Sequence, residues 1–174
     1  IALDPFFNQK NVSLIDSISA LDKLTMPHTK YYRYAIGKDY PDDYKAIERL
    51  VLDYLKHGKL IIAYDYDNTV FDYHNKGYRF DMVVKLLQEC REYAQFIVYT
   101  HSNDDRHDSI RDYLNANDIP WDTINKGIVW ANGKEEGKLF YSHFLDDRAG
   151  LRSSYLILSK AITIIKENPK DADD

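Results

Sequence analysis

Two aspartates separated by one residue, Asp65 and Asp67, follow the apolar run 60–64 and could take part in chemistry. Such a run, bounded by polar residues, predicts a buried strand of a parallel sheet. Side chains alternate along a strand, so both carboxylates point to the same side, and two like charges so close need a cation or a shared proton. Ligands of open α/β sheets bind outside the carboxyl ends of the strands, which makes the pair a candidate site. The alternative is that both are surface aspartates that cap the next helix.

Three later signals favour a site, because each places a polar residue at the edge of an apolar, strand-like run. Thr100 follows one such run, Lys138 precedes another, and the pair Asp146-Asp147 follows that second run. Carboxylates gathered in one cleft suit Mg²⁺, while a lysine and a threonine hydroxyl can hold phosphate oxygens. The combination predicts phosphoryl transfer. One aspartate would attack phosphorus, and a second, two residues on, would protonate the leaving oxygen and then activate water.

Composition limits the classes of protein that the chain can belong to. Its 174 residues suit one domain with a sizeable core, and its formal net charge is -5. The negative charge argues against a nucleic-acid or membrane-surface protein, although it leaves room for a local basic patch. No apolar run approaches the roughly 18 residues of a membrane span. A single cysteine, Cys90, and a start without a signal-peptide pattern lead us to expect a reducing, cytoplasmic location.

Helical periodicity predicts an N-terminal helical extension over residues 1–58 that packs on the rest of the chain. One helix begins at Ser13, and a second opens at Pro41 and ends at Gly58. Between them, the stretch 28–40 is rich in tyrosine and basic residues. It could bind a base or a phosphate, although packing is the commoner role of such residues.

From residue 59 to 174, predicted strands and helices alternate. This order implies right-handed crossovers and an α/β, Rossmann-like parallel sheet with helices on both faces. Besides the strands already named, the pattern predicts a helix over about 79–93, a helix from about Asn103, a short strand at 128–130, a strand over 139–145 and a C-terminal helix.

These residues together resemble the motifs of the haloacid dehalogenase (HAD) superfamily. The segment Asp65-Tyr66-Asp67-Asn68-Thr69-Val70 is similar to its first motif, DxDxT[VL]. Thr100 matches the hydroxyl of the second motif, Lys138 the lysine of the third, and Asp146-Asp147 the acidic pair of the fourth. The resemblance covers residues 59 to about 150.

The resemblance implies a role for each matched residue. Asp65 would be the nucleophile and Asp67 the general acid and base. Mg²⁺ would be held by Asp65, the backbone carbonyl of Asp67, and the pair Asp146 and Asp147. The dehalogenases lack the second aspartate of the first motif, so Asp67 favours a phosphatase or phosphotransferase. Contacts to the substrate, including its phosphoryl group, would come from Asn68, Thr69, Thr100, His101 and Lys138.

The intervals between the motifs are too short for the large cap domains of this superfamily. The chain therefore resembles a capless member, a kind that accepts large substrates or closes its site with a partner subunit. The N-terminal helices could serve as a lid instead, and the sequence leaves a homo-oligomer open.

We therefore expect a Mg²⁺-dependent phosphatase acting on a phosphorylated small molecule. The alternatives are a phosphotransferase, a nucleotide or nucleic-acid-end phosphatase, or a non-catalytic binding module on the same scaffold. Receiver domains also combine aspartates, threonine, lysine and Mg²⁺, but in another order along the chain.

Overall fold

The computed structural model describes residues 42–132 and 134–168. The strands are β1 (Leu60–Asp65), β2 (Ala94–Tyr99), β3 (Thr123–Ile124) and β4 (His143–Leu145). The helices are α4 (Asp42–His57), α5 (Asp81–Glu89), the 3₁₀ turn η2 (Asp104–Arg106), α6 (His107–Ala116), α7 (Val129–Asn132) and α8 (Leu151–Glu167). The helix expected from Ser13 and the tyrosine-rich stretch 28–40 lie outside the described residues.

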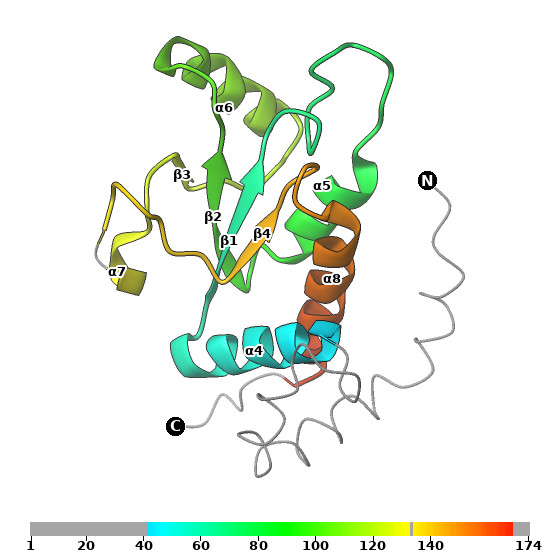
Figure 1. Ribbon diagram of the computed structural model, residues 1–174, viewed down its shortest axis with the longest axis vertical. Coiled ribbons are helices and arrows are strands. Elements are labelled where there is room, and N and C mark those ends of the chain that lie inside the picture. Colours follow the sequence, from blue (N-terminus) through cyan, green and yellow to red (C-terminus); the bar gives the residue numbers. More distant parts are fainter. Residues whose placement is uncertain (1–41, 133, 169–174) are drawn as a thin grey trace.

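The four strands form one open parallel sheet in the order β3-β2-β1-β4 (Figure 1). This confirms the predicted α/β class with a parallel sheet. Because every strand runs the same way, all four carboxyl ends meet at one edge of the sheet. In the central pair, Asp65 of β1 stands opposite Tyr99 of β2.

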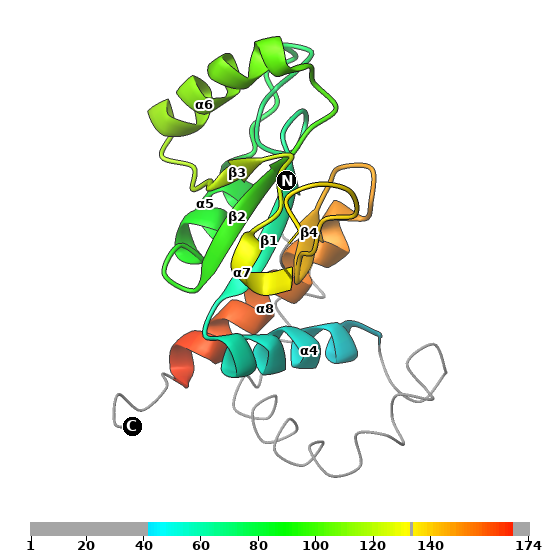
Figure 2. The same cartoon turned by 90° about the vertical axis from the view of Figure 1, so that its left-hand side faces the viewer.

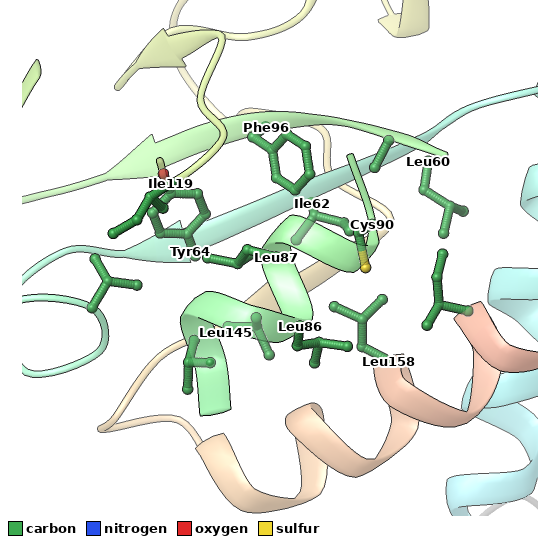
Figure 3. Close-up of a cluster of buried hydrophobic side chains, with 14 of the residues drawn as sticks. Leu60, Ile62, Tyr64, Leu86, Leu87, Cys90, Phe96, Ile119, Leu145 and Leu158 are labelled. Atoms are coloured by element: carbon green, nitrogen blue, oxygen red, sulfur yellow. The ribbon is translucent and has the colours of Figure 1, made fainter. Parts of the chain in front are cut away.

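The main core lies on the face of the sheet that α5 and α8 cover. Alternate residues of the strands supply one side of it, such as Ile62 and Tyr64 of β1 and Phe96 of β2, and Leu87 and Leu158 fill in from the helices (Figure 3). Cys90 is fully buried in the same cluster and packs in the core. This burial also raises the pKa of its thiol to about 12.

The opposite face of the sheet is covered quite differently. Its small apolar cluster joins Ile61, Ala63 and Ile97 of the strands to Ile128 and Leu139. Figures 1 and 2 show α7 on this side and the longer helices α5 and α8 on the other. Within residues 42–132 and 134–168, the prediction of helices on both faces therefore holds for this face only through the four-residue α7, beside which non-helical chain packs.

Two predicted strands differ from the observed structure. Within the apolar residues 128–130 a short helix begins at Val129 where a strand was predicted, and the strand that pairs with β2 is Thr123–Ile124. The last strand is His143–Leu145 and not 139–145, because only this short piece pairs with β1. Just before it, Ser142 donates its backbone N–H to Ile61. A run of three apolar residues is too short for its periodicity to distinguish a strand from a helix.

Helix α4 ends where predicted, at Gly58, which has a positive φ of 77° and donates its N–H to the carbonyl of Tyr54. Its buried residues Ile47, Leu50 and Val51 join the main core, so α4 packs on the sheet domain. It lies at the amino ends of the strands (Figure 1), away from the carboxyl ends. Helix α4 itself is therefore no lid over that edge.

Candidate active site

The sheet brings three of the predicted signals to its carboxyl edge. Asp65 is the last residue of β1, Thr100 follows β2, and Asp146-Asp147 follows β4. They line one open cleft of about 660 Å³ together with Asp67. Residues as far apart in sequence as Asp65 and Asp147 meet because β1 and β4 are neighbours in the sheet.

The carboxylates of Asp65, Asp146 and Asp147 form an acidic cluster, in which one oxygen of each lies within 4.8 Å of the others. Burial, and then the charges of Asp146, Asp147 and Asp67, raise the pKa of Asp65 from 3.8 to about 7. Burial is also the first cause that raises the pKa of Asp147. Such a cluster gains stability from a cation, and its oxygen donors are those that Mg²⁺ prefers.

Asp67 lies in the same cleft but has a cationic neighbour. Its carboxylate is 3.5 Å from the guanidinium of Arg106, which also donates to the hydroxyl of Ser102 at 2.8 Å. The same guanidinium lies 5.6 Å from the ring centre of Tyr73. Arg106 is thus fixed by three neighbours and can orient Asp67.

The two threonines at the site have different environments. Thr69 is completely buried, donates to Asp65 at 3.4 Å and accepts the backbone N–H of Asp147 at 3.1 Å. Its hydroxyl therefore links the end of β1 to the loop after β4. Thr100 is held by Asn125, whose side chain accepts from the Thr100 N–H at 2.8 Å and donates to its carbonyl at 2.7 Å. Its hydroxyl accepts the N–H of Ser102 at 3.1 Å and lines the cleft.

Other predicted contacts surround the acidic cluster. Asn68 has a positive φ of 59°, a conformation that asparagine tolerates, and its side chain lines the cleft. Its Oδ1 is buried without a hydrogen-bond partner among the described residues. His101 is exposed and also lines the cleft.

Two predicted substrate contacts, Thr69 and Lys138, do not line this cleft: Thr69 is buried, and Lys138 lies elsewhere on the surface. Lys138 is exposed, and it lines a neighbouring groove of about 570 Å³ with Tyr99, Leu139 and Tyr141. It does not stand at a strand edge, since β4 begins only at His143.

Several residues at the site were not predicted from the sequence. Arg106 contacts Asp67 and Asn125 contacts Thr100, and each pair is more than twenty residues apart in the chain. No local sequence pattern predicts such contacts. Arg148, in contrast, directly follows the acidic pair and lines the cleft as an exposed cation. Its position directly after a carboxylate pair was the signal that could have identified it as a residue of the cleft.

Comparison with family models, curated proteins and solved structures found no match for this chain. Among the described residues, no helix is long and apolar enough to cross a membrane. Nor does any separate cap domain interrupt the described residues between Asp65 and Lys138, where only a loop, α5, η2, α6, β3 and α7 occur besides β2.

Proposed function

We propose that this chain is a Mg²⁺-dependent phosphatase that hydrolyses phosphomonoesters through an aspartyl-phosphate on Asp65. The main support is the convergence of Asp65, Asp146 and Asp147 beside Asp67 at the carboxyl edge of a parallel sheet. The donor set fits the ion, because three carboxylates offer hard oxygen ligands and their repulsion is relieved by a cation. Mg²⁺ bound there would neutralise charge on the carboxylates and on the phosphate.

In the first half of the reaction, an Asp65 oxygen attacks phosphorus and the bond from phosphorus to the leaving oxygen breaks. Asp67, positioned by Arg106, gives its proton to that oxygen, so an alcohol departs. In the second half, Asp67 takes a proton from water, and the water oxygen attacks the same phosphorus. Phosphate leaves, Asp65 is released as a carboxylate, and Asp67 is protonated again.

The phosphoryl oxygens need donors of their own. Thr100 and Arg148 line the cleft and offer a hydroxyl and a guanidinium, which suits phosphate geometry. Lys138, assigned to the same task by the resemblance, lies in the neighbouring groove. We keep its contact with the transferred phosphoryl group as a prediction that kinetics can separate from another role.

The experiment is hydrolysis of p-nitrophenyl phosphate by the full chain, with and without Mg²⁺. Asp65→Asn, nearly isosteric but unable to form the acyl-phosphate, should abolish turnover while leaving cooperative unfolding intact. Asp105→Asn, an exposed carboxylate in η2, is the matched control. A folded Asp65→Asn variant that keeps most of its activity would overturn the nucleophile. No Mg²⁺-dependent turnover on any phosphoester of a broad panel would instead favour the non-catalytic alternative.

A phosphotransferase would use the same residues with an alcohol in place of water. Adding an alcohol acceptor to the assay separates the two activities. A phosphatase releases inorganic phosphate and p-nitrophenol in equal amounts. A phosphotransferase forms a new ester with the alcohol and therefore releases less inorganic phosphate than p-nitrophenol.

A further inference from the structure

The groove that Lys138 lines adjoins the acidic cleft. We call it the aromatic groove and define it by its lining residues, which are Tyr99, Ile128, Lys134, Lys138, Leu139, Phe140 and Tyr141. Tyr99 and Leu139 also line the acidic cleft. A ligand whose phosphate lies in the cleft can therefore reach into the groove with the rest of its structure.

The sheet explains why cleft and groove adjoin. Ile61 and Ala63 of β1 and Ile97 of β2 belong to the cluster on the less covered face. Two residues further along each strand, the alternation of side chains places Asp65 and Tyr99 on this same face, where they stand opposite each other. The proposed nucleophile thus shares its face of the sheet with the wall of the groove.

The chemistry of the aromatic groove differs from that of the cleft. Tyr99, Phe140 and Tyr141 are each about two-fifths exposed, although large aromatic side chains are stable when buried. The ring of Phe144 packs against two of them, because its centre lies 5.8 Å from the ring centre of Tyr99 and 5.3 Å from that of Tyr141. An exposed aromatic surface that the fold holds in place is typical of a binding surface.

The charge of the groove is positive, in a chain whose formal net charge is -5. Its described lining carries Lys134 and Lys138 and no carboxylate. Aromatic rings beside lysines suit a flat ring that carries an anionic group, because the ring stacks and the lysines neutralise the charge.

We propose that the aromatic groove binds the leaving group of the substrate, and that this group is a nucleoside carrying a second phosphate. The base would stack on Tyr99, Phe140 or Tyr141, and the second phosphate would contact Lys134 and Lys138. This chemistry occurs in a nucleoside 3′,5′-bisphosphate and at the phosphorylated end of an oligonucleotide. The assignment rests on the proposed phosphatase activity and names its substrate class.

The kinetic test compares kcat/KM for ribose 5-phosphate, a nucleoside 5′-monophosphate, a nucleoside 3′,5′-bisphosphate and a 3′-phosphorylated oligonucleotide. Stacking of the base should raise kcat/KM roughly tenfold from the first substrate to the second. The second phosphate should raise kcat/KM further for the bisphosphate and the oligonucleotide. Whichever of these two has the higher kcat/KM indicates whether the substrate is a free nucleotide or an oligonucleotide end. Equal values for all four substrates would overturn the proposal.

Substitutions test the aromatic residues and the lysines of the groove separately, through ratios of kcat/KM between two substrates. Tyr141→Ala should reduce the preference for the nucleoside over ribose 5-phosphate, and Lys134→Ala the preference for the bisphosphate over the monophosphate. Matched controls are Tyr78→Ala and Lys85→Ala, which replace exposed residues outside cleft and groove. Ratios that stay as in the wild type in both groove variants would refute the proposal.

Lys138→Ala separates the two roles of this residue. If Lys138 holds the second phosphate, the loss falls mainly on the bisphosphate. An equal loss on every substrate would place Lys138 on the transferred phosphoryl group and overturn its part in the groove.

Binding provides a readout that does not depend on turnover. Calorimetric titration of the Asp65→Asn variant with the bisphosphate, in the presence of Mg²⁺, should show tighter binding than titration with ribose 5-phosphate. Tyr141→Ala or Lys134→Ala in the same background should remove this difference. Binding with this pattern but without hydrolysis by the wild type would refute the phosphatase and not the groove. Hydrolysis without the binding difference would refute the groove alone.

Discussion

Asp65 and Asp67 are separated by a single residue, yet their surroundings differ. Asp65 lies among other carboxylates and is partly buried, whereas Asp67 is paired with Arg106 at 3.5 Å. Two carboxylates in different environments can divide the work of a nucleophile and a proton donor between them. The raised pKa of Asp65 is in itself that of a proton donor, so its proposed role as nucleophile requires a cation in the cluster, which would favour the charged carboxylate.

Asp67→Asn should lower turnover about 10²–10⁴-fold, the usual contribution of a positioned acid or base. The loss should be largest for alkyl phosphates, whose leaving oxygen needs a proton, and smallest for p-nitrophenyl phosphate. Steady-state kinetics on both substrates provides the measurement, with Asp105→Asn as the control. Equal losses on the two substrates would contradict the role of proton donor.

At the level of elements, the sequence predicted best those that bury a continuous apolar run. β1 and β2 were recognisable because their runs of apolar residues end in polar ones, and α4 because its apolar face ends at Gly58. The segment between β3 and β4 could not be predicted in the same way. It buries little beyond Ile128 and Leu139, so no periodicity marks its local structure.

The position of Lys138 follows from that same segment. Its assignment to the phosphoryl group assumed a strand that begins next to it, whereas the chain runs on for five residues to His143. The contacts that orient Asp67 and Thr100 could not be predicted either, because Arg106 and Asn125 are far from these residues in the sequence.

Gly127→Ala should destabilise the loop that carries α7. The N–H of Gly127 donates to the carbonyl of Glu135 at 2.9 Å, which closes this loop, and an added Cβ would lie 1.9 Å from the carbonyl oxygen of Lys134. Forcing an extra carbon into a packed site costs about 1–3 kcal/mol. Thermal unfolding compared with Lys126→Ala, which truncates an exposed neighbour, provides the measurement. An unchanged melting temperature would show that this loop contributes nothing to stability.

The contact between β4 and α8 should make the fold sensitive to acid. His143 is buried and donates from Nε2 to the carbonyl of Ser154 at 2.8 Å. Burial is the main cause that lowers its pKa below 6.5, and the charge of Arg49 on α4 acts in the same direction. The unfolded chain therefore binds a proton that the folded chain resists, so the free energy of unfolding falls as the pH drops below about 6.5.

His143→Gln keeps an N–H donor for Ser154 but cannot take up the proton. Its free energy of unfolding should fall less than that of the wild type over the same decrease in pH, as measured by urea unfolding at several pH values. His57→Gln, which replaces an exposed histidine at the end of α4, is the matched control. Parallel pH profiles for His143→Gln and the wild type would argue against a contribution from His143.

In the part of the chain that the structure describes, α4 and the proposed active site lie at opposite edges of one sheet. α4 lies across the amino ends of the strands, while the acidic cleft and its loops occupy the carboxyl ends (Figure 1). One face carries the main core under α5 and α8, and the less covered face holds the aromatic groove. The cleft at Asp65 and the aromatic groove therefore lie outside the main core.

The acidic cluster should also link metal binding to global stability. Without a cation, Asp65 is partly buried among carboxylates that repel it, so Asp65→Asn should raise the melting temperature of the metal-free protein near neutral pH. In the wild type, Mg²⁺ at a hundred times its dissociation constant should add about 2.7 kcal/mol to the free energy of unfolding.

Thermal unfolding with EDTA and with Mg²⁺ measures both effects. Asp147→Ala removes one carboxylate of the cluster and should lose most of the Mg²⁺-dependent gain, whereas the exposed Asp105→Asn should keep it. If the metal-free Asp65→Asn protein is no more stable than the wild type, repulsion in the cluster is too weak to matter. If Mg²⁺ stabilises Asp147→Ala as much as the wild type, the ion binds elsewhere, because a cation held between β1 and β4 must sense the loss of one of its three carboxylates.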